Sequence, residues 1–436
     1  MASVPKGPRS PLGLKEVSRF RNSPLDFVAD CAARYGDMVS FRLGRRQAYL
    51  VNHPDLVREV LVTTANAHRR GPIMQRARMM MGDGLLTSEE PLHTEQRRAL
   101  QPAFHRERVA GYACIADEVT RTVAGSWQDG ASIDVRGEML RASLDVVGQS
   151  LFGSDLRGET QRIAEAVNAS MVMMDLIFVP WSKQLLRFPF GRAARFREAL
   201  RYLDDVIDRL MAAGEAGGDG IAGWLLQRRQ DAAWRRQVRD ECLTLLLAGH
   251  ETVANALTFA LLLVAQRADI AERIGAEADL HAHLPPGERV DRLRYARAVL
   301  AEAMRLYPPV WILGRTTRND VSIGSQNVGA NSVIFLSQWV VHRDARWFPE
   351  PLAFVPERFL DGSVQRQAYF PFGAGSRQCI GESVAWMEGT LALAAIARRW
   401  RLELISDPQP PLTARVTLRP TTPVTIRVTT RSTARR

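Results

Sequence analysis

The sequence predicts a mainly α-helical protein of the α+β class, with a large helical body and a small strand-rich portion. From Leu92 to Pro286 the apolar residues recur almost throughout with a helical period. Shorter stretches on either side alternate between apolar and polar residues, as strands do. Although 436 residues could hold two or three domains, we expect one domain over 24–428. An irregular lead-in over 1–23 would precede it, and a frayed basic tail over 429–436 would follow.

The N-terminal elements follow from turn residues and alternation. Pro24 to Tyr35 predicts a short helix that ends at Gly36. Two strands should follow, over 38–43 and 47–51, joined at Gly44.

The next stretch is less regular. Asn52 is expected to cap a helix over Pro54 to Leu61. Residues 65–84 show no clear period and are rich in methionine and arginine. We expect a loop with a short helix there, able to act as a mobile lid.

Glycine and proline divide the helical body. The clearest loop is the glycine-rich run over 214–220, and other breaks are expected near Pro102, Gly130, Gly153, Pro180 and Pro189. A helix over 292–306 should be halted by Pro308. Beyond it we expect strands and coil, a helix over 382–398 and strand-like alternation over 402–428.

The net charge of +11 comes almost entirely from arginine. The arginines are scattered and no basic tract is interleaved with aromatic residues, so we do not expect nucleic-acid binding. A basic face that docks an acidic electron-transfer protein and a solvated arginine-rich surface are equally open interpretations.

Four cysteines without a pairing pattern favour a reducing cytoplasm. The first residues have no apolar core and predict neither a signal peptide nor a membrane anchor. The longest apolar stretch, over 243–264, is interrupted by His250, Glu251 and Asn255 and falls short of a clean membrane span. We therefore expect a soluble, cytoplasmic protein.

One loop, over 371–381, joins a cysteine to an arginine and three glycines. A lone cysteine is usually a small buried apolar residue. Here the glycines allow positive φ and a close backbone approach to a flat ligand. Cys379 also lies just before the helix expected from Glu382, and a helix N-terminus stabilises a thiolate.

Five positions of this loop match, one by one, the haem-binding loop of the cytochrome P-450 family of haem-thiolate monooxygenases: Phe372, Gly375, Arg377, Cys379 and Gly381. The resemblance implies the cytochrome P-450 fold, with haem b between a long central helix and the cysteine loop. It implies that the Cys379 thiolate ligates the iron, that Arg377 binds a haem propionate, and that Gly373 belongs to the same cofactor-binding loop.

A second motif lies in the middle of the long apolar helix. Ala248 and Thr252 share one helix face, and Glu251 lies on the adjacent face. A buried helix with a polar interruption is the plain interpretation, but an unpaired buried charge is costly. The stretch resembles the oxygen-binding motif of the family. The resemblance implies that Ala248 lies at the cofactor and that Thr252 and Glu251 deliver protons to dioxygen.

Glu302 and Arg305 are three residues apart on a helix, which by itself suggests an exposed ion pair. The family resemblance instead implies a buried network that includes Arg358 of a Pro-Glu-Arg-Phe element, with one carboxylate serving two guanidinium groups. We assign these three residues a structural role.

His93 and Arg97 stand four apart on the helix expected from Leu92, which is weak on its own. The resemblance implies that they bind haem propionates together with Arg315. Three arginines and one histidine would then balance the two propionates.

The substrate pocket should be mostly apolar, with Ile177, Ala248, Trp311, Ile312 and Leu313 as its expected lining. Core packing is at least as good an interpretation for the apolar run over 171–178. Terpenoid, fatty-acid, steroid and polyketide substrates are all compatible with such a pocket.

The sequence thus predicts a monooxygenase that activates dioxygen and hydroxylates or epoxidises an apolar small molecule. Because no flavin, nicotinamide or iron–sulfur fingerprint is present, electrons should come from a ferredoxin or flavodoxin with its NAD(P)H reductase. We expect a monomer. The alternatives are a peroxide-driven haem peroxygenase and a non-catalytic haem-binding sensor.

Overall fold

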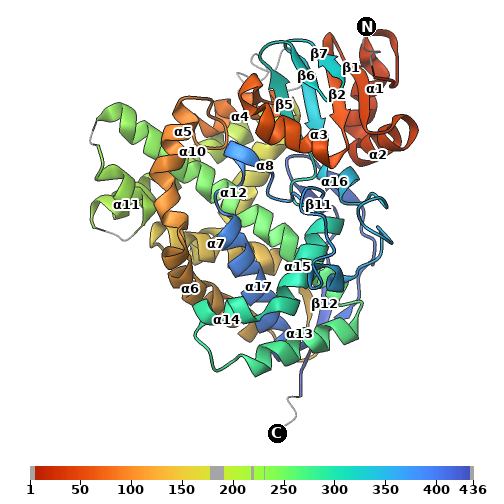
Figure 1. Ribbon diagram of the computed structural model, residues 1–436. Coiled ribbons are helices and arrows are strands. Elements are labelled where there is room, and N and C mark those ends of the chain that lie inside the picture. The colour runs from red at the N-terminus through yellow and green to blue at the C-terminus, as the bar shows by residue number, and fades with distance from the viewer. Residues whose placement is uncertain (1–4, 177–190, 218–219, 230, 433–436) are drawn as a thin grey trace. The chain divides into compact units, whose positions relative to one another are not determined.

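The computed structural model describes residues 5–176, 191–217, 220–229 and 231–432 (Figure 1). Residue contacts divide the chain into two compact units, and each is described by itself. The first unit comprises Met1–Gln75, Ala298–Cys379 and Pro411–Thr421. The second comprises Arg76–Arg297, Ile380–Pro410 and Thr422–Arg436.

A mixed five-stranded sheet organises the first unit. Its strand order is β1-β2-β8-β5-β3, with bounds Met38–Leu43, Arg46–Val51, Val333–Leu336, Leu313–Thr317 and His68–Arg70. β2 and β8 are parallel, and the other neighbours are antiparallel. The predicted hairpin of β1 and β2 is confirmed, with Gly44 at φ 63° in its turn.

The lead-in predicted to be irregular is in fact partly helical, because α1 spans Leu14–Asn22. Its Phe20 ring lies 5.9 Å from Phe27 of α2 (Pro24–Tyr35) and 5.1 Å from Phe335 of β8. Tertiary packing of an aromatic side chain therefore stabilises a helix that the proline-rich sequence did not reveal.

Two further expectations for this unit are corrected. The helix after β2 is α3 (Pro54–Arg58), which continues into a π-helical turn, η2 (Glu59–Thr63). The N-cap of α3 is His53, whose Nδ1 accepts from the Asp55 N–H at 3.2 Å. Asn52, the expected cap, donates to the Gly36 carbonyl instead.

The stretch over 65–84 is more ordered than the loop we expected. It forms η3 (Ala65–Ala67), β3 and α4 (Pro72–Met81), and β3 pairs antiparallel with β5. The sequence hid the strand because only three residues pair, and their partners lie some 250 positions away.

The remaining elements of the first unit are short. They are the hairpins β6–β7 (Val321–Ile323, Gln326–Val328) and β10–β11 (Leu412–Ala414, Leu418–Pro420), helix α16 (Gln338–Val341) and the 3₁₀ turns η1 (Pro11–Gly13), η6 (Pro356–Phe359) and η7 (Gly375–Arg377). Helix α15 (Arg294–Leu306) begins in the second unit and ends in the first.

The second unit is a helical body. Its helices are α5 (Leu92–Leu100), α6 (Arg106–Gly125), α7 (Val135–Phe152), α8 (Thr160–Leu176), α10 (Gly191–Glu215), α11 (Ile221–Leu226), α12 (Ala232–Val264), α13 (Ala268–Leu280), α14 (Pro286–Arg292) and α17 (Glu382–Arg399), with the 3₁₀ turns η4 (Gln101–Phe104) and η5 (Arg157–Glu159). The expected breaks at Gly130 and Gly153 are present; those at Pro180 and Pro189 lie outside the described residues.

Helix α12 is the core of this unit. Among the described residues it alone is long and apolar enough to cross a membrane, yet 78% of its apolar window is buried inside the protein. α7 packs along it (Figure 1), and a Cβ on Gly249 would come within 2.9 Å of Val147. The burial identifies α12 as a core helix rather than an exposed apolar rod.

A three-stranded sheet completes the unit, in the order β4 (Ser132–Asp134), β12 (Thr425–Thr430) and β9 (Trp400–Leu404). The tail is not frayed from 429 as expected, since β12 reaches Thr430 and the Arg431 side chain pairs with Glu272 at 2.7 Å and Asp279 at 2.6 Å. Two carboxylates on α13 thus hold the basic end of the described chain.

Candidate active site

The cysteine loop of the first unit is fixed by its own backbone. The Cys379 N–H donates to the Phe372 carbonyl at 3.0 Å. Gly373 and Gly375 have φ values of 71° and 74°, which residues with a Cβ rarely adopt. A Cβ on Gly375 would also collide with the Leu61 carbonyl oxygen. The glycines therefore allow a tight loop that leaves the cysteine at its end.

The four thiols differ in access. Cys31 and Cys242 are buried, and burial raises the pKa of both, that of Cys31 to about 11. Cys114 is exposed in the middle of helix α6, with no loop around it. Cys379 is exposed within the glycine loop, three residues before α17 begins. Of the two exposed thiols, that of Cys379 lies in a loop with two glycines at positive φ, whereas that of Cys114 lies on a helix.

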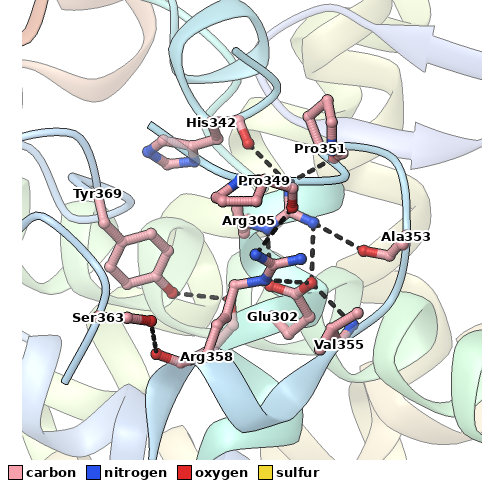
Figure 2. A network of polar contacts seen from close by, with 11 residues as sticks. Glu302, Arg305, His342, Pro349, Pro351, Ala353, Val355, Arg358, Ser363 and Tyr369 are labelled. Carbon is pink, nitrogen blue, oxygen red and sulfur yellow. Dashed lines mark hydrogen bonds and ion pairs between the residues drawn. The ribbon is translucent and has the colours of Figure 1, made fainter. Parts of the chain in front are cut away.

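A buried ionic network lies in the same unit (Figure 2). The Glu302 carboxylate accepts two hydrogen bonds from Arg305, at 2.7 and 2.8 Å, and one from Arg358 Nε at 3.1 Å. It also accepts from the Val355 N–H at 2.9 Å. One carboxylate thus serves two guanidinium groups, and Glu302 and Arg305 have no solvent exposure.

Backbone carbonyls saturate the rest of the network. Arg305 donates to the carbonyls of His342, Pro351 and Ala353 at 2.6–2.9 Å, and Arg358 donates to that of Pro349 at 3.1 Å. These bonds replace the hydration that the buried guanidinium groups lose.

His342 links this network to the cysteine loop, and sequence reasoning missed it. Its carbonyl accepts from Arg305, and its Nε2 accepts from the Phe370 N–H at 3.1 Å. The Phe370 carbonyl in turn accepts from Gly373 at 3.0 Å. Burial, with Arg305 and Arg343 nearby, holds the pKa of His342 well below its usual range, so the ring is neutral. No sequence motif marks this histidine.

Arg315 and three of the expected pocket residues, Trp311, Ile312 and Leu313, lie on or just before β5. Arg315 is buried in the strand, opposite Ile334 of β8. Trp311 is also buried, and its indole donates to the Arg415 carbonyl at 3.0 Å. This environment favours core packing for Trp311 over the expected pocket role. Ile312 and Leu313 are half-buried, and Ile177 lies outside the described residues.

In the second unit, α12 has an accessible window. Ala248 is exposed and Thr252 half-buried, whereas most of the surrounding helix is buried. The Thr252 hydroxyl donates to the Ala248 carbonyl at 2.8 Å. Glu251 is buried, with its Oε1 3.7 Å from Arg136 of α7. The threonine therefore stands at the accessible face while the acid is held by a neighbouring helix.

His93 and Arg97 share one face of α5, as their spacing predicts. His93 is buried with its Nδ1 3.2 Å from Glu90, and Arg97 is half-buried. Gly381, the residue before α17, accepts from the Ala385 N–H at 2.9 Å and so starts that helix.

A profile of the cytochrome P-450 family matches residues 5–428 of this chain. The chain belongs to the cytochrome P-450 family. Proteins similar to this P-450 include cyclooctatin synthase from Streptomyces melanosporofaciens, with 37% identity over 88% of this chain and 86% of the relative. Pentalenene oxygenase from Streptomyces avermitilis is 32% identical over 88% of each chain.

Two solved structures of cytochromes P-450 also resemble this chain. CYP175A1 from Thermus thermophilus superposes on this P-450 with a TM-score of 0.80 and 29% identity, covering 97% of this chain and 100% of that one. A six-coordinated cytochrome P-450 from the same species superposes with a TM-score of 0.73 and 30% identity, covering 93% of this chain and 98% of that one. The predicted P-450 fold is confirmed.

The protein is therefore a haem-thiolate monooxygenase that uses haem b, a cysteine thiolate ligand and dioxygen. The residues present suit such a group. An exposed thiol stands in a glycine-supported loop, and a buried arginine, Arg315, can meet a carboxylate.

Proposed function

We propose that this P-450 hydroxylates a terpenoid, with Cys379 as the iron ligand. The substrate class rests on the relatives, which include a cyclooctat-9-en-7-ol 5-monooxygenase, 34% identical over 87% of this chain, and the pentalenene oxygenase. The ligand assignment rests on one observation: Cys379 combines an exposed thiol with a loop whose glycines take positive φ.

Bound haem would supply the activation of dioxygen, and the chain's residues hold it and manage protons. We assign the propionates to His93, Arg97, Arg315 and Arg377. Phe372, Gly373 and Gly381 would complete the cofactor-binding loop. Guanidinium groups neutralise carboxylates through paired hydrogen bonds, which allows a dianionic group to be buried.

Proton delivery is assigned to Thr252 and Glu251. The Thr252 hydroxyl lies at the accessible window of α12, where Ala248 leaves room for a ligand. It can give up its bond to the Ala248 carbonyl and donate toward the window. The Glu251 carboxylate, held near Arg136, would replenish the proton at Thr252.

Electrons come from a separate redox partner, which we propose to be a ferredoxin or flavodoxin served by an NAD(P)H reductase. The chain has no fingerprint for a flavin, a nicotinamide or an iron–sulfur cluster. We further propose a monomer in the cytoplasm. Its four cysteines are free thiols, as in proteins of a reducing compartment.

The test is conversion of a panel of cyclic terpene hydrocarbons, fatty acids, steroids and polyketides, with a ferredoxin, its reductase and isotopically labelled dioxygen. Mass spectrometry should show one labelled oxygen gained by a terpenoid and by no other class. Turnover with peroxide alone but not with reduced ferredoxin would instead identify a peroxygenase. No turnover of any compound would favour a haem-binding sensor.

A further inference from the structure

A cavity of 510 Å³ lies within the second unit, and none of the site residues assigned above belongs to its lining. α6 and α17, which pack along each other in Figure 1, contribute most of its lining, and α13 and α14 contribute one residue each. Pockets for small ligands usually have volumes of about 300–1,000 Å³. The space is therefore large enough for a small molecule.

The floor of this cavity is apolar. Leu293, Leu391 and Ala394 are buried there, and Ala395 is half-buried. The two alanines leave room that leucines would fill. An apolar group entering the cavity would lose its contact with water and gain contact with these side chains.

The walls carry more positive than negative charge, with four arginines (Arg121, Arg289, Arg398 and Arg399) against Asp117 and Glu118. The nearly buried Asp117 carboxylate forms an ion pair with the Arg289 guanidinium at 2.8 Å and lies 3.7 Å from that of Arg121. Arg398 is paired with Asp279 at 2.9 Å.

Arg399 differs from the other three arginines. Its guanidinium lies 5.4 Å from the centre of the Trp400 ring, and no acidic partner stands beside it in the described part of the chain. Arg121, with a side chain 72% exposed, shares the single charge of Asp117 with Arg289. At the exposed side of the lining, Asp117 does not fully balance the charges of Arg121 and Arg399, and Glu118 is the one further carboxylate of the lining.

We propose that this cavity binds an amphipathic anion, with its apolar body on the Leu391–Ala394 floor and a carboxylate or phosphate head at Arg399 and Arg121. Guanidinium groups bind such heads through paired, charge-assisted hydrogen bonds. The lining shares no residue with the assigned haem and substrate sites, so the occupant is a second ligand and not the oxidised substrate.

The test is calorimetric titration of the full-length haem protein with decyl phosphate below its micelle concentration. We expect one molecule to bind without a shift of the haem absorption band. Arg399→Ala and Arg121→Ala should each weaken binding by about tenfold, the usual effect of losing a charge-assisted hydrogen bond. Ala395→Trp should abolish binding by filling the cavity. Arg108→Ala, which removes an exposed arginine from the same helix outside the cavity, should change nothing.

Two further titrations separate the sources of the head group. Inorganic phosphate alone should bind more weakly than decyl phosphate, because it cannot use the floor. Vesicles of anionic phospholipid should bind no more tightly than the free monomer. The proposal is overturned if decyl phosphate fails to bind, if only vesicles bind, if phosphate binds equally well, or if the cavity variants behave like Arg108→Ala.

Discussion

The Glu302 carboxylate holds the Arg305 guanidinium with both of its oxygens, at 2.7 and 2.8 Å, and neither side chain reaches solvent. Three residues apart on one helix, these groups would form a weak pair at the surface. Buried and joined by Arg358, they become a junction between α15 and the coil that leads to Cys379. A helix end and a long coil are thereby fixed to each other.

Replacing Glu302 by Gln should destabilise the protein strongly. The change leaves two buried guanidinium groups without a counter-charge, which typically costs about 3–5 kcal/mol. Thermal unfolding of the full chain measures the effect. Asp269→Asn is the control, because Asp269 and Arg267 form a similar two-point pair at the surface, worth less than about 1 kcal/mol. Equal losses in the two variants would contradict the network.

The ring nitrogen of His342 should support haem retention and thermal stability, because it accepts the Phe370 N–H. Leu in its place removes the acceptor of the Phe370 N–H and leaves that group unpaired, whereas Gln can still offer a carbonyl. We expect His342→Leu to lower haem retention and thermal stability more than His342→Gln does. Measured haem content that is the same in both variants would show that the bond to Phe370 does not support the loop.

The Thr252 hydroxyl should couple electron use to product formation. Thr252→Val keeps the side-chain shape and removes the hydroxyl, so a larger share of the electrons should leave as hydrogen peroxide. Thr258→Val is the matched control, since Thr258 makes the same helical bond, at 2.7 Å to the Ala254 carbonyl, in the buried part of α12. If the Thr252 variant still converted its electrons into product as the parent does, Thr252 would have no role in proton delivery.

Glu388 should make stability depend on pH. It is buried in α17 and accepts from the Ser143 hydroxyl at 2.6 Å; burial raises its pKa to about 8. In the unfolded chain this carboxyl titrates near 4.5, so between these values the folded state holds a proton that the unfolded state releases. Its contribution is therefore complete below about pH 4.5 and is lost as the pH rises through about 8.

Glu388→Gln keeps an acceptor for Ser143 but cannot ionise. We expect its melting temperature, relative to that of the parent protein, to rise between about pH 5 and about pH 8 and then to level off. Glu107→Gln, an exposed acid on α6, should show no such trend. A difference between the Glu388 variant and the parent that is flat across this range would mean that Glu388 does not titrate in the folded state.

Sequence patterns predicted those helices, strands and loops that are determined by residues adjacent in sequence. The β1–β2 hairpin, the helix that ends at Gly36, and the cysteine loop all depend on residues adjacent in sequence. The strand β4 was missed because its pairing of Ile133 with Ile426 joins residues almost 300 positions apart. Periodicity within three residues cannot reveal such a partner.

The same limit applies to the site. Glu302, Arg305 and Arg358 stand in short motifs that resemble those of the family, and that resemblance predicted their partnership. His342 belongs to no motif; its role arises from burial, from the Phe370 N–H 28 residues away and from the Arg305 guanidinium 37 residues away. The expected pocket role of Trp311 stays a prediction, and the bond from its indole to the Arg415 carbonyl, 104 residues away in sequence, could not be read from the sequence.

The most direct test of the account is the absorption spectrum of the reduced protein with carbon monoxide, recorded for the parent, Cys379→Ala and Cys114→Ala. If Cys379 is the iron ligand, the parent and Cys114→Ala show the thiolate-type band and Cys379→Ala loses it. A thiolate-type band that persists in Cys379→Ala and disappears in Cys114→Ala would contradict the assignment.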